Sequence, residues 1–259
     1  MVRIIEIDDN NDTSTCFKNN TDFEMVSIST KDGDEAFQDA IIKSFQSQDD
    51  FYLGIDSGGG LDSRKVLEII KDNELEDDFL YIIPVMNSLS SAKNAIDTYK
   101  LVNDHKNTLF VLNNVYNPSE IEKEFLFFFG SKDFGLDSLY EALKKPAIAI
   151  IEHTPLFEIA ALNGVTIKQL GDISKSFEAT GKNKNEILFE KSGGDSEKFK
   201  QLDNQYKQSK KCNEYLSRNL DQLKKIIQKS GKKKVCICST KGGVGKSTIA
   251  FHILPLCFN

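Results

Sequence analysis

Seven short apolar runs, rich in β-branched and aromatic residues, recur along this chain of 259 residues. Polar or turn-forming residues bound each run, and several runs are apolar nearly throughout, as is typical of parallel strands covered on both faces. The pattern predicts a sheet of buried strands. The runs span residues 2–7, 23–28, 51–56, 79–85, 108–113, 147–151 and 235–239.

Between these runs lie stretches with helical patterns, at residues 35–46, 63–72 and 91–102 among others. Alternating strands and helices predict an α/β fold, with a largely parallel sheet and helices on both faces. A chain of this length can bury a full core without disulfides or a metal, and we expect one domain over residues 1–259.

The segment from residue 166 to residue 229 is the most polar part of the chain. Glycine, lysine and asparagine clusters predict a loop or mobile stretch over 166–196. Apolar residues three and four apart then predict a long helix over 197–229. Twelve Lys and Arg against three Asp and Glu lie between Lys198 and Lys234, whereas the whole chain carries a net charge of −6. Such a basic segment favours a polyanionic partner, although a solvated helix face has the same composition.

Composition excludes some classes of protein. No run of 18 or more apolar residues occurs, and the N-terminal residues do not resemble a signal peptide, so we expect a cytoplasmic protein without a transmembrane segment. The five cysteines follow no disulfide or zinc spacing. Cys236 and Cys238 are therefore predicted to be small buried residues of a strand rather than metal ligands.

The segment VCICSTKGGVGKSTIAFHIL, near the C-terminal end of the sequence, carries the strongest functional signal. A strand-like run passes through a glycine-rich loop into a helix, which is the context of a phosphate-binding loop. Glycines 242, 243 and 245 let backbone N–H groups face phosphate oxygens, Lys246 supplies a cation, and Ser247 supplies a hydroxyl for Mg²⁺. Thr240 stands where the strict motif has its first glycine.

The sequence TKGGVGKST resembles the deviant Walker A motif of the ParA/MinD family of ATPases. The resemblance implies ATP and Mg²⁺ as cofactors and an ATP-dependent homodimer. It also implies that Lys241 and Lys246 are catalytic, with Lys241 reaching the nucleotide of the partner subunit. The implied nucleotide-binding residues here are Lys241, Gly242, Gly243, Val244, Gly245, Lys246, Ser247 and Thr248.

Three further segments resemble later motifs of the same family. In VRIIEIDDNNDTS, Asp8 corresponds to the acid that positions the attacking water, and Glu6 replaces the preceding acid. In FYLGIDSGGGLDS, the resemblance implies that Asp56 holds Mg²⁺ through water, together with Ser247. In TLFVLNNVYN, it implies that Asn113 contacts the adenine.

These motifs occur in a rotated order, because the phosphate-binding loop comes last. We interpret the chain as a circularly permuted ParA/MinD-like fold, in which joining Asn259 to Val2 restores the usual order. The strand at 235–239 is then expected in the middle of the sheet, with Lys246 beside Asp56 and Asp8. The expected parts are 1–170 (first switch, Walker B and base-binding part), 171–231 (polar connection and basic helix) and 232–259 (phosphate-loop strand and helix).

The resemblance is closest to ParA-like partition ATPases. It implies non-specific DNA binding, a stimulating ParB-like partner protein, association with the nucleoid, and a role in DNA partition, plasmid segregation or cargo positioning. Basic side chains of the long helix suit phosphate contacts. The candidates for DNA binding are Lys207, Lys210, Lys211, Arg218, Lys224 and Lys225.

Three other functions share this loop. A MinD-like switch would bind a membrane through an amphipathic helix, an iron–sulfur scaffold would need converging cysteines, and an adaptor would have lost its ATPase activity. The replacement of an acid by Glu6 keeps the last alternative open. ATP turnover with and without duplex DNA distinguishes an active partition ATPase from such an adaptor.

Overall fold

The computed structural model describes residues 2–7, 17, 20–28, 42, 52–102 and 106–258. Seven strands form one sheet in the order β2-β1-β3-β7-β4-β5-β6, and all neighbouring strands are parallel. Each strand matches one of the seven apolar runs to within two residues, which confirms the predicted α/β fold. The strands are β1 (Val2–Ile7), β2 (Glu24–Ser27), β3 (Tyr52–Ser57), β4 (Phe79–Val85), β5 (Thr108–Val115), β6 (Ala147–Glu152) and β7 (Lys234–Ile237).

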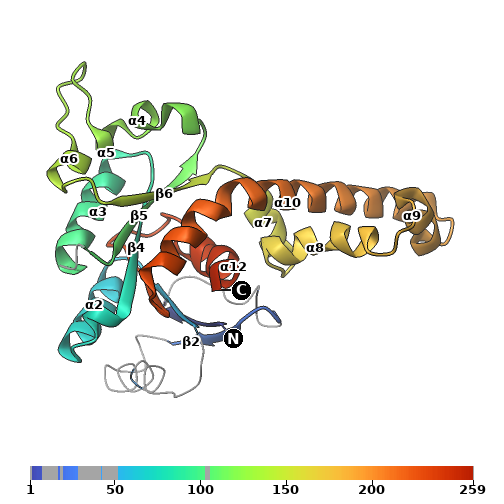
Figure 1. The fold of residues 1–259 in the computed structure, drawn as a ribbon, viewed down its shortest axis with the longest axis horizontal. Helices are drawn as coiled ribbons and strands as arrows, with labels where there is room; N and C mark the ends of the chain where they lie inside the picture. The colour runs from blue at the N-terminus through green and yellow to red at the C-terminus, as the bar shows by residue number, and fades with distance from the viewer. Residues whose placement is uncertain are drawn as a thin grey trace.

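Helices cover both faces of the sheet, so the core is divided into two large apolar clusters (Figure 1). One face carries α2 (Leu61–Asp72), α3 (Leu89–Val102), α4 (Ile121–Glu124), α5 (Leu126–Phe129) and α6 (Leu139–Ala142), with the 3₁₀ turns η3 (Glu76–Asp78) and η4 (Pro118–Glu120). The other face carries α7 (Leu156–Leu162), α8 (Ile167–Glu178), α10 (Ser196–Ser230), α11 (Lys246–Thr248), the π-helical turn η5 (Ile249–Ile253) and α12 (Leu254–Phe258). The helix expected at 35–46 lies outside the described residues, apart from Ile42.

Strand β7 comes last in the sequence but lies inside the sheet, between β3 and β4. This confirms the expected central position of the run at 235–239. The described chain ends are also close together, because the ring of Phe258 stacks on Tyr52 at 4.3 Å and Tyr52 is the register partner of Val2. Cys236 in β7 and Cys238 just after it are fully buried in the same core cluster, so the predicted burial of both is confirmed.

The loop predicted over 166–196 is wrong, because this segment forms α8 and α9 (Lys184–Ser192). Both helices begin with a capping box, in which the side chains of Thr166 and Asn183 accept backbone N–H groups and Gln169 and Glu186 bond back. Such boxes satisfy the unpaired first N–H groups of a helix, so a polar composition here marks helix starts. We call α8, α9 and the first half of α10 the helical arm, which projects beyond the sheet in Figure 1.

The long helix predicted at 197–229 is confirmed as α10, which has 35 residues. Its first half packs on α8 and α9, and its second half runs along the edge strand β6. In the part of the chain that the structure describes, no helix has both the length and the apolar character needed to cross a membrane.

Candidate functional site

Residues 240–246, which we call the glycine loop, follow the carboxyl end of β7 between β3 and β4. Ligands of open parallel sheets bind at this end of the strands. Gly243 and Gly245 adopt φ angles of 70° and 91°, which residues with side chains rarely adopt. The Lys246 side chain is buried, and its Nζ donates to the carbonyl oxygen of Lys241 at 3.1 Å. The loop therefore curls around the lysine ammonium, an arrangement suited to an anion.

The start of the loop is attached to α3 through Thr240. Its backbone N–H donates to Thr98 Oγ1 at 3.1 Å, and its hydroxyl donates to the carbonyl oxygen of Asn94 at 3.2 Å. The second of these bonds needs the hydroxyl of residue 240, so threonine at the first glycine position adds a contact with α3 that glycine could not make. Sequence reasoning noted the replacement but missed Thr98 and Asn94, because nothing in the spacing links α3 to the loop.

The segment Gly58–Gly60, after β3, lies directly against the glycine loop. A Cβ atom added to Gly59 would lie 2.8 Å from the backbone nitrogen of Gly242, closer than real contacts allow. The Ser63 hydroxyl lies 2.6 Å from the carbonyl oxygen of Gly58 and accepts from the N–H of Ser239 at 3.2 Å. The Gly58–Gly60 segment and the glycine loop therefore contact each other.

Asp56 is buried near the carboxyl end of β3, and its Cα pairs with that of Ile237 in β7. It points to the sheet face that carries α11 and α12, because a Cβ atom on Gly54, two residues earlier, would contact Leu254 of α12. Glu6 is also buried and is the register partner of Asp56 in β1. Asp8 lies outside the described residues, so its role stays a prediction.

The residues predicted to hold Mg²⁺ fit that ion chemically. Mg²⁺ binds oxygen atoms and commonly uses one or two carboxylates while keeping several waters. The Asp56 carboxylate lies on the face covered by the helix that contains Ser247, and both groups supply oxygen. Within the described ranges, no group of three or more His, Cys, Asp or Glu side chains could hold a metal.

Asn113, predicted to contact adenine, is hydrogen-bonded to the glycine loop. Its side-chain amide donates to the carbonyl oxygen of Val244 at 3.1 Å. A Cβ atom on Gly245 would overlap this amide, so the side chain fills the space that the glycine leaves. Asn113 also lines a hollow next to the loop, and its adenine contact stays a prediction.

A stacked ring pair that sequence reasoning missed lies beside this hollow. His153 stacks on Tyr116 with ring centroids 4.3 Å apart, and its Nδ1 lies 2.6 Å from Asn114 Oδ1. Asn114 has a φ angle of 65° at an irregularity between β5 and β6. Asparagine tolerates this conformation better than most residues. The Asn113–Asn114 pair near the end of the strand was therefore the one sequence signal for this irregularity.

Three hollows surround the glycine loop. The first, about 370 Å³, lies between the loop and α7, and the second, about 300 Å³, reaches His153. The third, about 390 Å³, lies between the loop and the start of α3. These volumes lie in the usual range for small-molecule sites. The first hollow is lined by Phe157, Glu158, Ala161, Gly242, Gly243, Gly245, Lys246, Ser247, Thr248 and His252.

His252 connects the helix after the loop to the helical arm. It lies in the π-helical turn η5, and its Nδ1 accepts the backbone N–H of Ile167, the first residue of α8, at 3.2 Å. The rings of Phe17 and Phe157 enclose it, each 5.3 Å away between ring centroids. Burial lowers the pKa of His252 to about 4, so the imidazole is neutral near pH 7.

Lys241, the predicted cross-subunit lysine, extends toward the start of α3. Its Nζ donates to Ser90 Oγ at 2.6 Å, and the residue is partly exposed. The side chain also lines the hollow between the loop and α3. Within its own subunit, Lys241 therefore contacts a serine hydroxyl, which it would have to leave to reach a partner.

The six predicted DNA-binding residues lie along α10, where they are mixed with acidic residues. Lys207, Lys211, Arg218 and Lys225 are exposed and share one helix face, because they are four and seven residues apart. Exposed Glu214 lies on the same face, within one turn of Lys211 and Arg218. Two lysines are paired: Lys207 with Asp203 at 2.7 Å, and Lys210 with Glu178 at 3.3 Å, which raises the pKa of Lys210. Lys224 is partly buried.

Comparison of this chain with protein-family models, curated proteins and solved structures yields no match. The likeness to the ParA/MinD family is therefore carried by short motifs, above all by the glycine loop. The function is inferred from these motifs and from the contacts between the residues that form the loop and its surroundings.

Proposed function

We propose that this chain is a Mg²⁺-dependent ATP hydrolase of the ParA type, which dimerises on ATP and binds DNA without sequence preference. In this proposal it acts in DNA partition or cargo positioning, and a ParB-like partner stimulates it. The nucleotide phosphates bind in the glycine loop, and the base lies toward Asn114 and His153.

The observation that best supports ATP binding is the conformation of the glycine loop. Two left-handed glycines and the buried Lys246 create a concave, positively charged backbone turn at the carboxyl edge of the sheet. Backbone N–H groups and a lysine are the groups that hold phosphate oxygens in such loops. The two adjoining hollows between the loop, α7 and His153 leave room for the rest of a nucleotide.

Hydrolysis is supported by the groups that surround the loop. When bound, Mg²⁺ would neutralise phosphate charge, and Ser247 and Asp56 are the residues that would hold it. The Gly58–Gly60 segment touches the loop at Gly242, so in this proposal a change at the terminal phosphate would act on the segment that joins β3 to α2. Asp8 is the proposed residue that orients the attacking water.

ATP hydrolysis measured with and without duplex DNA tests this function. Turnover that rises with DNA supports a partition ATPase, and no turnover under either condition favours the adaptor.

DNA affinity should fall steeply with salt, because phosphate contacts release counterions. Lys211→Glu with Arg218→Glu should weaken binding to unrelated sequences alike, whereas Lys123→Glu with Lys132→Glu, on other exposed segments, is the matched control. If both double variants weakened DNA binding equally, α10 would not be the DNA-binding surface.

Lys241→Ala is expected to retain ATP binding and to lose ATP-dependent dimerisation. The physical reason is that a cation acting across the interface stabilises the partner's phosphates and contributes little within its own subunit. Light scattering after size exclusion, with and without ATP, measures the dimer. Ser90→Ala is the control, since it removes the hydroxyl that Lys241 contacts and leaves the lysine. An unchanged dimer in Lys241→Ala would exclude the cross-subunit role.

We also propose that the fold is a circular permutation of the ParA/MinD arrangement. Support comes from motif order together with the position of β7 between β3 and β4 and the proximity of Phe258 to Tyr52. A rearranged chain that runs 232–259 and then 2–230 is expected to fold and bind ATP like the original. Circular dichroism and nucleotide titration check this, and a rearranged chain without a cooperative unfolding transition would count against it.

A further inference from the structure

A hollow of about 490 Å³ lies at the amino ends of β5 and β6, at the opposite edge of the sheet from the glycine loop. Three segments form it: the end of α3, the start of β5 and the turn between α6 and β6. Its apolar wall includes Tyr99, Leu143 and Pro146. It is therefore separate from the proposed nucleotide site and similar in size to small-molecule sites.

Four lysines line this hollow: Lys100, Lys106, Lys144 and Lys145. All four are exposed, and none of the described residues that line the hollow is acidic. Glu141, outside the lining, contacts Lys145 at 3.2 Å. Because the chain as a whole is acidic, this concentration of positive charge in a concave site favours an anionic ligand.

The backbone supports the same assignment. Lys144 and Lys145 have φ angles of 60° and 55°, a conformation that glycine adopts at a lower cost. At the ends of α9 and α10 the chain places glycine in this conformation, at Gly193 and Gly231. At the end of α6 two consecutive lysines occupy it instead. Two unfavourable side chains at one turn indicate a function for those side chains.

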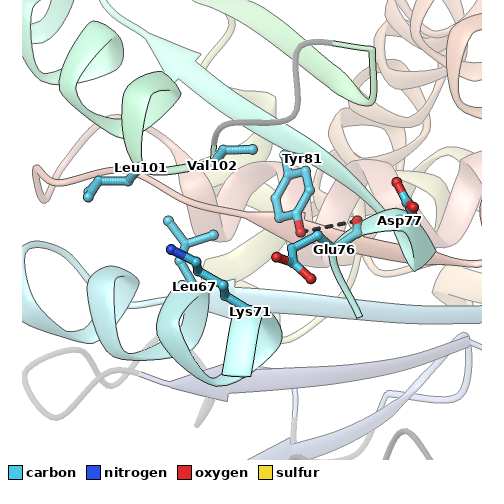
Figure 2. A pocket seen from close by; sticks show the side chains of 7 residues that line it. All are labelled: Leu67, Lys71, Glu76, Asp77, Tyr81, Leu101 and Val102. Atoms are coloured by element: carbon cyan, nitrogen blue, oxygen red, sulfur yellow. Dashed lines mark hydrogen bonds between the residues drawn. The ribbon is translucent and has the colours of Figure 1, made fainter. Parts of the chain in front are cut away.

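A neighbouring hollow at the same edge of the sheet provides a contrast. It has a volume of about 340 Å³ and lies between α2 and α3 (Figure 2). Lys71, Glu76 and Asp77 are the charged residues that line it, and the Tyr81 hydroxyl donates to the carbonyl oxygen of Glu76 at 3.3 Å. Its lining holds one lysine against two acids, so the excess of positive charge belongs to the hollow lined by the four lysines and not to this neighbour.

We propose that the hollow lined by Lys100, Lys106, Lys144 and Lys145 is a second binding site, which takes a small ligand with adjacent phosphate groups. The lysines hold the phosphates as flexible point charges. Tyr99, Leu143 and Pro146 contact any apolar part of the ligand. A concave site of this size suits a nucleotide or a short polyphosphate better than the outside of a duplex.

Calorimetric titration of the full chain with inorganic tripolyphosphate at low salt tests this site. The wild type is expected to bind two equivalents, one in the glycine loop and one in the lysine hollow, and Lys246→Ala is expected to keep only the second. In the Lys246→Ala background, Lys144→Gly with Lys145→Gly should weaken tripolyphosphate binding roughly tenfold or more, because charge-assisted contacts are lost.

The double glycine variant should leave the melting temperature unchanged or raise it, since glycine relieves the left-handed strain. Titration with ATP in parallel distinguishes a nucleotide, which binds more tightly than tripolyphosphate, from a phosphate chain alone.

The control is Lys198→Ala with Lys200→Ala, which removes two exposed lysines from α10 and should leave tripolyphosphate binding unchanged. Weakening by this control equal to that by the glycine pair would overturn the proposal, because charge alone would explain the binding. A single equivalent in the wild type that disappears with Lys246→Ala would also overturn it. Binding of duplex DNA at these lysines without binding of tripolyphosphate would assign the hollow to a nucleic-acid surface instead.

Discussion

Lys246→Ala is expected to abolish ATP hydrolysis, with kcat/KM falling by about 10²–10³-fold or more, the scale found when one preorganised charge or donor is removed from an active site. The physical reason is the burial of Lys246 within the glycine loop, where its Nζ lies 3.1 Å from the carbonyl oxygen of Lys241. No other lysine lines the hollow next to α7 among the described residues, so its charge cannot be replaced there.

The measurement is steady-state phosphate release, combined with fluorescent-nucleotide titration to separate binding from turnover. Lys246→Met is the matched variant, because it keeps much of the buried stem and removes the charge. Equal loss in both variants assigns the effect to the ammonium group, whereas a nearly active methionine variant would assign it to packing. Undiminished hydrolysis by Lys246→Ala would exclude the glycine loop as the catalytic site.

His252→Asn is expected to remove a large acid-dependent loss of stability. The buried imidazole has a pKa of about 4, against an ordinary value of 6.5. Well above pH 6.5 both the folded and the unfolded chain hold it neutral. As the pH falls from about 6.5 toward 4, the unfolded chain binds a proton that the folded chain excludes, so the free energy of unfolding decreases. The full effect is about 3 kcal/mol, at about 1.4 kcal/mol per unit of pKa difference.

Chemical denaturation at several pH values between 4 and 7 measures this effect. Asparagine retains a side-chain oxygen that can accept the Ile167 N–H, but it does not titrate, so the slope of stability against pH should flatten. The chain has three histidines, and exposed His153 supplies the matched control. A slope that flattens in His252→Asn more than in His153→Asn assigns the effect to the buried imidazole. Equal slopes for the wild type and His252→Asn would show that His252 does not carry the effect.

His252 also defines a structural role that its sequence context does not reveal. It accepts the first N–H of α8, so the helix after the glycine loop is bonded to the helical arm. The π-helical turn that contains it begins immediately after Thr248. A shift of this helix on nucleotide binding would therefore act on the arm through one hydrogen bond, and on Phe17 and α7 through the aromatic contacts.

Local patterns in the sequence correctly predicted which segments are strands, and they are the basis for the proposed phosphate site. The strands were identifiable because they are buried on both faces and so lack alternation, as in FLYIIPV of β4, where every residue is buried. The glycine loop was identifiable because its chemistry requires glycines and a lysine at fixed spacing along the chain. The loop predicted over 166–196 is wrong because capping residues and exposed helix surfaces have the same polar composition as a loop.

Contacts between residues that are distant in the sequence could be found only in the three-dimensional structure. The position of β7 between β3 and β4 depends on sheet order, which a local pattern does not encode. The contacts of Thr240 with Thr98 and of Asn113 with Val244 join residues more than a hundred positions apart. The lysine hollow likewise forms only because the ends of three segments converge at one edge of the sheet. Local propensity fixes the elements, whereas these sites depend on burial and packing between elements, for which single residues carry no local signal.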